Sequence, residues 1–135
     1  MDDIKSKVRF VIPVKPKGIR DMVDFYGRGL GFQVVDDHEV LFGGDAGAGL
    51  FVYREKRDPV SGISILQIWV EKDFGVFCRH LKEIGATFTE IARMRAGYAA
   101  HVLDPSGNLI TIRCDEDDAQ NDEIVYGWPE TVTID

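Results

Sequence analysis

The sequence has no long apolar run, and it has only two cysteines, Cys78 and Cys114. A membrane-spanning helix needs about 20 consecutive apolar residues, so we expect no transmembrane segment and no membrane partner. The first residues carry neither the basic nor the apolar part of a secretory signal, and a cytoplasmic protein is therefore expected. Two cysteines are too few for a disulfide scaffold, so both are expected to be reduced, buried thiols.

Positive charge is also scarce. The chain has 16 Lys and Arg residues against 23 Asp and Glu residues, which gives a net charge of −7. An acidic chain repels phosphate groups, so nucleic acid is not expected as a partner, whereas a cationic or neutral small molecule is. Hydrophobic residues make up 44% of the 135 residues, a share typical of a globular protein, and this length allows one compact domain or two small halves that share a core.

One order of predicted elements occurs twice along the chain. In each half, a strand is followed by a helix and then by three strands. The helix of the first half is expected to end at Gly31, and that of the second half to begin after Asp73, a candidate N-cap, and to end at Gly85. The expected strands cover residues 7–14, 32–35, 39–42, 50–54, 63–70, 86–91, 97–103 and 109–114.

The repeated order predicts two modules in a single domain, module one about 7–56 and module two about 63–114, with a polar connector at 57–62. An acidic linker and a C-terminal tail, 115–135, follow. Helices that alternate with strands in two equal halves predict an α+β fold, in which each helix packs on one face of a mixed sheet. The opposite, concave face would then be free to bind a ligand.

Three short motifs resemble the vicinal oxygen chelate superfamily: Asp24–Tyr26, Leu30–Phe32 and Asp104–Asn108. This superfamily includes glyoxalase I, extradiol dioxygenases, methylmalonyl-CoA epimerase, fosfomycin-modifying enzymes and the bleomycin-binding resistance proteins. The resemblance covers roughly residues 8–114. It implies two βαβββ modules that form half-barrel mixed sheets with helices on the outer face, and it implies a homodimer.

The metal enzymes of this superfamily bind their ion through His, Gln or Glu side chains from both modules. The corresponding positions here are Arg9, strand 50–53, which has no carboxylate, Ile65 with Gln67 nearby, and Thr111. A catalytic divalent ion needs about three protein ligands, and these residues do not supply them. The resemblance therefore implies no metal, no other cofactor and no catalytic residue, and it favours the bleomycin-binding branch over the metal enzymes.

The turn signal at 104–108 predicts a hairpin in which His101 faces Thr111 and Leu103 faces Leu109. Successive residues of a strand point to opposite faces of a sheet. The apolar residues of this hairpin are therefore expected to face the helix: Ala100, Val102, Ile110 and Ile112. Its polar residues would face the concave side.

On that concave side, His101, Thr111 and Arg113 would meet Gln67 and Trp69, which share a face of strand 63–70. Trp69 could stack on a flat ligand, although a core tryptophan fits the pattern equally well. His101 could equally be a half-exposed strand residue without a role. Tyr98 is a candidate rim aromatic, and Tyr53 is either a pocket wall or a core residue. The expected ligand-binding residues are thus Tyr53, Gln67, Trp69, Tyr98, His101, Thr111 and Arg113.

The leading hypothesis is a metal-independent binding protein that captures an aromatic or cationic compound in a concave groove. Arg113 favours a ligand with an aromatic body and at least one oxygen acceptor. The alternative is a lyase, isomerase or dioxygenase of the same superfamily, with a displaced metal site that uses His101 and a carboxylate such as Glu39, Glu71 or Glu90. A third reading is a module that mainly dimerises or interacts through its tail.

Overall fold

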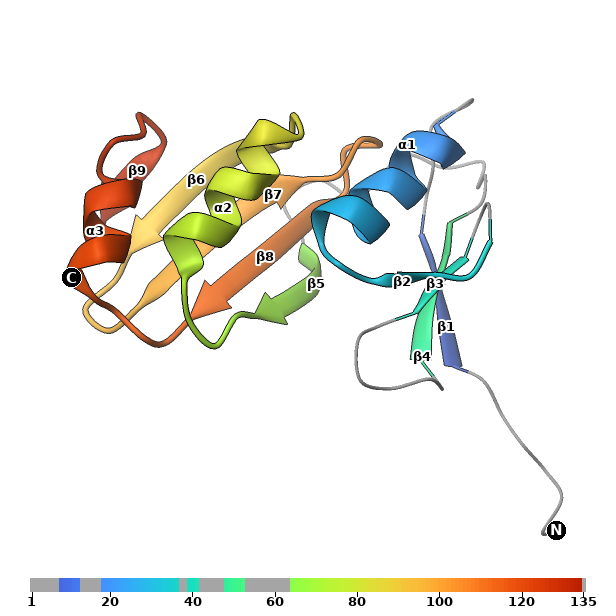
Figure 1. Ribbon diagram of the computed structural model, residues 1–135, viewed down its shortest axis with the longest axis horizontal. Coiled ribbons are helices and arrows are strands. Elements are labelled where there is room, and N and C mark those ends of the chain that lie inside the picture. The colour runs from blue at the N-terminus through green and yellow to red at the C-terminus, as the bar shows by residue number, and fades with distance from the viewer. Residues whose placement is uncertain (1–7, 13–17, 37–38, 42–47, 53–63, 135) are drawn as a thin grey trace, which may run out of the picture. The chain divides into compact units, whose positions relative to one another are not determined.

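The computed structural model describes residues 8–12, 18–36, 39–41, 48–52 and 64–134 (Figure 1). The chain divides into two compact units, Met1–Pro59 and Val60–Asp135, and each is described by itself. We call them the first and the second unit.

The first unit contains a four-stranded sheet and one helical segment. The sheet has the order β1-β4-β3-β2, in which β1 runs parallel to β4 and the other pairs are antiparallel. Gly31 has a φ of +81° and follows the helical segment, as the expected left-handed cap requires. The elements are β1 (Val8–Ile12), α1 (Ile19–Asp24), the π-helix η1 (Phe25–Gly29), β2 (Gln33–Val34), β3 (Glu39–Leu41) and β4 (Ala48–Val52).

The second unit repeats the order strand, helix and three strands, and adds a helix and a short strand. Its five-stranded sheet has the order β5-β8-β7-β6-β9, with β5 parallel to β8 and β9 parallel to β6. The expected α+β class and the mixed sheets are confirmed. The elements are β5 (Ser64–Trp69), α2 (Phe74–Glu83), β6 (Thr87–Arg93), β7 (Tyr98–Leu103), β8 (Leu109–Cys114), α3 (Ala119–Val125) and β9 (Thr131–Thr133).

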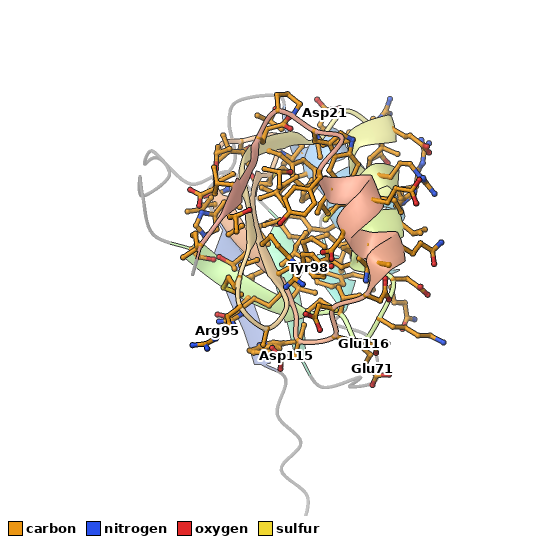
Figure 2. The ribbon with its side chains drawn as sticks, turned by 90° about the vertical axis from the view of Figure 1, so that its left-hand side faces the viewer. Asp21, Glu71, Arg95, Tyr98, Asp115 and Glu116 are labelled. Carbon is orange, nitrogen blue, oxygen red and sulfur yellow. The ribbon has the colours of Figure 1, made fainter. Side chains whose placement is uncertain are left out.

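Helices α2 and α3 lie on the same face of this sheet (Figures 1 and 2). The hairpin residues expected to face a helix, Ala100, Val102, Ile110 and Ile112, are all fully buried. Helix α2 adds Phe74 and Leu81 to the same core. Burying one side chain of this size stabilises the fold by about 1.5–3 kcal/mol, so this layer fixes which face of β7 and β8 points away from the helices.

The start of α2 differs from the expectation. Asp73 is the residue before the helix, but it has a φ of +60° and its side chain makes no capping hydrogen bond. The side chain of Asn121 in α3 takes this role, because its Oδ1 accepts a hydrogen bond of 2.9 Å from the backbone N–H of Gly75. The two helices are in close contact there: a Cβ on Gly75 would lie 2.9 Å from Cβ of Ile124.

The acidic segment after residue 114, expected to be a linker, is helical from Ala119 onward, where α3 begins. Asp118 caps this helix, and its Oδ1 accepts a hydrogen bond of 2.7 Å from the N–H of Asn121. The acidic run did not predict this cap, because Asp is common both at the N-cap of a helix and in linkers. In the described ranges, no helix has the length and apolar character needed to cross a membrane.

The end of the chain extends the sheet. β9 pairs with β6 through Thr131 opposite Ile91. Lys82 of α2 holds the connection to β9, because its ammonium group lies 2.7 Å from Oε1 of Glu130 and 4.9 Å from the ring centroid of Trp128. This ion pair holds the pKa of Glu130 below its ordinary value.

Candidate functional site

The hairpin of β7 and β8 has the expected register. His101 pairs with Thr111 and Leu103 pairs with Leu109. Asp104 fixes the turn, because its Oδ1 accepts hydrogen bonds of 2.9 Å from the backbone N–H groups of Ser106 and Asn108. An aspartate that bonds to its own turn in this way is a common local signal, and here it determines the direction of every side chain in the hairpin.

The register places two rows of residues on the face of the sheet opposite α2 and α3, which we call the helix-free face because the helices described for the second unit lie on the other side. Directly paired residues share a face of a sheet. The polar row runs across four strands and consists of Gln67, Thr111, His101 and Glu90. The Trp69 row lies beside it and consists of Trp69, Arg113, Ala99 and Ala92.

Five of the seven expected ligand-binding residues therefore lie on one face: Gln67, Trp69, His101, Thr111 and Arg113. Gln67 is exposed, His101 and Arg113 are half-buried, and Thr111 is buried between its neighbours. Trp69 is 55% exposed, which rules out the alternative of a core tryptophan. The face thus combines one large aromatic side chain with an amide, a hydroxyl, an imidazole and a guanidinium.

Trp69 and Arg113 form a pair. The guanidinium carbon of Arg113 lies 4.9 Å from the ring centroid of Trp69, which is the geometry of a cation–π interaction. One side of the indole ring is therefore in contact with the protein's own arginine. The Nε–H of Arg113 is buried and has no hydrogen-bond acceptor in the part of the chain that the structure describes.

The other two expected residues do not join this face. Tyr98 is fully buried on the helix side, where its ring stacks on Phe74 with centroids 4.9 Å apart. The expectation of a rim position is wrong for a simple reason: Tyr98 and His101 are three residues apart on one strand and so point to opposite faces. Tyr53 lies outside the described residues.

A cluster around Tyr98 ties α3 to the sheet, and it was not foreseen. The Tyr98 hydroxyl donates a hydrogen bond of 2.6 Å to Oδ1 of Asp122, which also accepts from Nε of Arg93 at 2.7 Å. Nη2 of Arg93 lies 2.8 Å from Oδ2 of Asp117. The Tyr98 hydrogen bond, helped by Arg93, holds the pKa of Asp122 below its ordinary value. Burial, together with the Asp122 contact, raises the pKa of Tyr98.

The two cysteines are free and buried, as expected. Burial raises the pKa of both thiols above the ordinary value. A thiol with a raised pKa carries little thiolate near neutral pH and is a poor nucleophile. The cysteines therefore supply no reactive group to the helix-free face.

The superfamily's divalent metal does not fit the described residues of this face. Strands are about 4.8 Å apart, so Gln67 and Glu90 lie roughly 14 Å apart at the ends of the polar row, whereas the ligands of one ion lie about 2 Å from it. Arg113, in the Trp69 row, adds a positive charge that repels a metal ion. No group of three or more His, Cys, Asp or Glu side chains that could hold an ion occurs among the described residues.

Two units with the same βαβββ order and open mixed sheets define a paired-module fold of the vicinal oxygen chelate type. The chain belongs to the Glyoxalase/Bleomycin resistance protein/Dioxygenase superfamily, whose sequence profile matches residues 14–112. Among curated protein sequences, none matches this chain significantly.

Solved structures with this fold include an antibiotic binding protein and a protein described as a glyoxalase/dioxygenase. The antibiotic binding protein TnmS3 from Streptomyces sp. CB03234 has 22% sequence identity and a TM-score of 0.63, over 84% of this chain and 98% of that chain. A glyoxalase/dioxygenase from Nostoc punctiforme has 17% identity and a TM-score of 0.65, over 85% and 94%. A superfamily member from Sphaerobacter thermophilus has 24% identity and a TM-score of 0.58, over 82% and 98%. Identities this low establish the fold alone.

Proposed function

We propose that this protein binds a small aromatic molecule, without a metal ion, on the helix-free face of the second unit. The observation that carries the proposal is the 55% exposure of Trp69 beside the polar row. An exposed large aromatic residue next to a few polar groups is typical of small-molecule sites. The similarity of fold to an antibiotic binding protein supports this proposal over a purely structural role.

The alternative function, a lyase, isomerase or dioxygenase with a displaced metal site, has less support. It needs His101 together with Glu39, Glu71 or Glu90. Of these, only Glu90 pairs with His101 across neighbouring strands. Glu71 is exposed beyond the end of β5, and Glu39 belongs to the first unit. Two potential ligands fall short of the roughly three that a catalytic ion needs.

The proposal predicts that ligand binding changes the environment of Trp69 and hence its fluorescence. In a Trp128→Phe background Trp69 is the only tryptophan of the chain. Titration with a panel of fused-ring aromatic compounds should then change the fluorescence of Trp69. Trp69→Ala should weaken binding of the best compound, measured by calorimetry, by about 2- to 12-fold beyond the loss of contact area, because the stacking surface is removed.

Val76 provides a control, since it is an exposed apolar residue of α2 on the helix side. Val76→Ala should leave the affinity unchanged. Dialysis against EDTA should also leave it unchanged, because the proposal requires no metal. A Trp69→Ala variant that binds the best compound as tightly as the wild-type protein would contradict the location of the site, and loss of binding in EDTA would contradict metal independence.

We also infer that the protein is a homodimer in the cytoplasm. Tyr126, Val132 and Ile134, near the C-terminus, are each about half exposed, and β9 lies at an edge of its sheet. An exposed apolar edge of this kind is stabilised when a second copy covers it. Free, buried cysteines agree with a reducing compartment. Light scattering at micromolar concentration should give twice the 15.2 kDa mass of the chain, and a monomeric mass would contradict the dimer.

A further inference from the structure

The two half-buried arginines of the second unit's sheet differ in their partners. Arg93 forms ion pairs with both Asp117 and Asp122. For Arg113, the described residues supply the ring of Trp69 and no carboxylate. This difference exists in a chain with 23 acidic residues, two of which, Asp115 and Glu116, follow Arg113 closely in the sequence. Among the described residues, therefore, no carboxylate neutralises the charge of Arg113 as Asp117 and Asp122 neutralise that of Arg93.

The surroundings of Arg113 favour an oxyanion as its missing partner. Stacking on Trp69 holds the planar guanidinium in one orientation, so less freedom is lost when it forms hydrogen bonds. Its buried Nε–H has no acceptor in the described structure, and such an orphaned donor is costly unless a partner arrives. A carboxylate accepts two parallel hydrogen bonds from a guanidinium edge, which a neutral carbonyl or a cation does not.

The side chain of Trp69 offers an aromatic surface beside Arg113. It is 55% exposed, whereas the next two residues of the Trp69 row, Ala99 on β7 and Ala92 on β6, are half-buried and buried. A ligand that reaches Arg113 can therefore bring a flat ring into contact with the indole.

Building on the proposed function, we infer that the ligand is a planar aromatic carboxylate, whose carboxylate binds Arg113 and whose ring contacts the exposed indole of Trp69. This inference narrows the expected aromatic or cationic compound to an anion. A cationic ligand placed beside Arg113 would be repelled by its positive charge, because Glu90, the carboxylate of the polar row, lies two strands away on β6.

Three probes of the same ring test the charge: 2-naphthoate, 2-naphthamide and the 2-naphthylmethylammonium ion, each titrated calorimetrically into the full-length protein. Because hydrogen bonds between charged groups are about twice as strong as neutral ones, 2-naphthoate should bind at least 10-fold more tightly than the amide. The ammonium probe should bind most weakly.

Arg113→Gln should weaken binding of 2-naphthoate by about 10- to 100-fold and leave 2-naphthamide within about 2-fold. Arg95→Gln is the matched control, because it makes the same change of charge at an exposed residue between β6 and β7 (labelled in Figure 2). It should affect neither probe by more than about 2-fold. Trp69→Ala should weaken both the acid and the amide, because both lose the contact with the indole ring, and circular dichroism melting checks that each variant is folded.

The outcomes separate this inference from the proposed function. If the amide or the ammonium probe binds at Trp69 as tightly as 2-naphthoate, or if Arg113→Gln weakens acid and amide equally, the inference is wrong and the binding function stands. If none of the three probes binds at millimolar concentration, and no compound of the fused-ring panel changes Trp69 fluorescence, the binding function and the inference both fail.

Discussion

Replacing Gly97 with alanine is expected to destabilise the second unit by at least about 2–4 kcal/mol. Gly97 has a φ of +100°, a conformation that residues with a Cβ adopt at a cost. A Cβ at this position would also overlap the backbone carbonyl oxygen of Cys114 at the end of β8. A backbone group cannot move aside without disturbing the β7–β8 pairing, so strain and overlap add. Urea denaturation followed by circular dichroism measures the loss.

Gly85→Ala is the matched control. Gly85 has a similar φ of +91° after α2, but a Cβ there would have no atom within 4 Å. In Gly85→Ala only the backbone strain at positive φ remains, so the free energy of unfolding is expected to fall by about 1–2 kcal/mol. If Gly97→Ala costs no more than Gly85→Ala, the close approach of the residue before β7 to the end of β8 is contradicted.

Local signals in the sequence were enough to predict the helix-free face. Asp104 to Asn108 is a turn that satisfies its own backbone, so it fixed the register of β7 and β8 before any tertiary contact was known. Period-two alternation then placed His101, Thr111 and Arg113 together. The same alternation placed Gln67 and Trp69 on one face of strand 63–70, and the parallel pairing of β5 with β8, seen in the structure, brings them beside the hairpin.

Features that depend on tertiary contacts could not be predicted in this way. The capping of α2 by Asn121 joins residues that are 46 positions apart, and no local pattern in the sequence predicts it. The pairing of Arg113 with Trp69 depends on side-chain conformations in neighbouring strands, which alternation alone does not specify. The metal positions inferred from the superfamily carry poor metal ligands, among them Arg9 and Ile65, and residue types alone do not specify another ligand.

Tyr98 is a buried residue of the helix side and not the expected rim aromatic. The expectation of a rim aromatic rested on its place after Gly97, at the start of a strand. The alternation that was applied to His101 also places Tyr98 on the helix side, where α3 covers it. Because that helix was not predicted, no partner for a buried tyrosine hydroxyl was expected. The partner is Asp122.

Substitution of Tyr98 is therefore also expected to lower the free energy of unfolding strongly, because the side chain has a structural role. Tyr98→Ala removes a fully buried ring that stacks on Phe74, and should cost about 3–5 kcal/mol of the free energy of unfolding. Tyr98→Phe keeps the ring and removes only the donor to Asp122, and should cost about 1–3 kcal/mol. Chemical denaturation at pH 7 measures both. The Phe variant should bind an aromatic ligand on the helix-free face as tightly as the wild-type protein does.

The pH dependence of the Tyr98→Phe effect tests the cause. The hydroxyl lowers the pKa of Asp122 below its ordinary value, so its stabilising contribution is complete well above that ordinary pKa and is lost as the pH falls through the lowered pKa. The difference in unfolding free energy between wild type and Tyr98→Phe should thus be constant from about pH 5 to 7 and shrink below about pH 4. A difference that stays the same at pH 3 would mean that the hydroxyl stabilises the fold without acting on the Asp122 carboxylate. A tighter or weaker ligand affinity in Tyr98→Phe would place Tyr98 in the site after all.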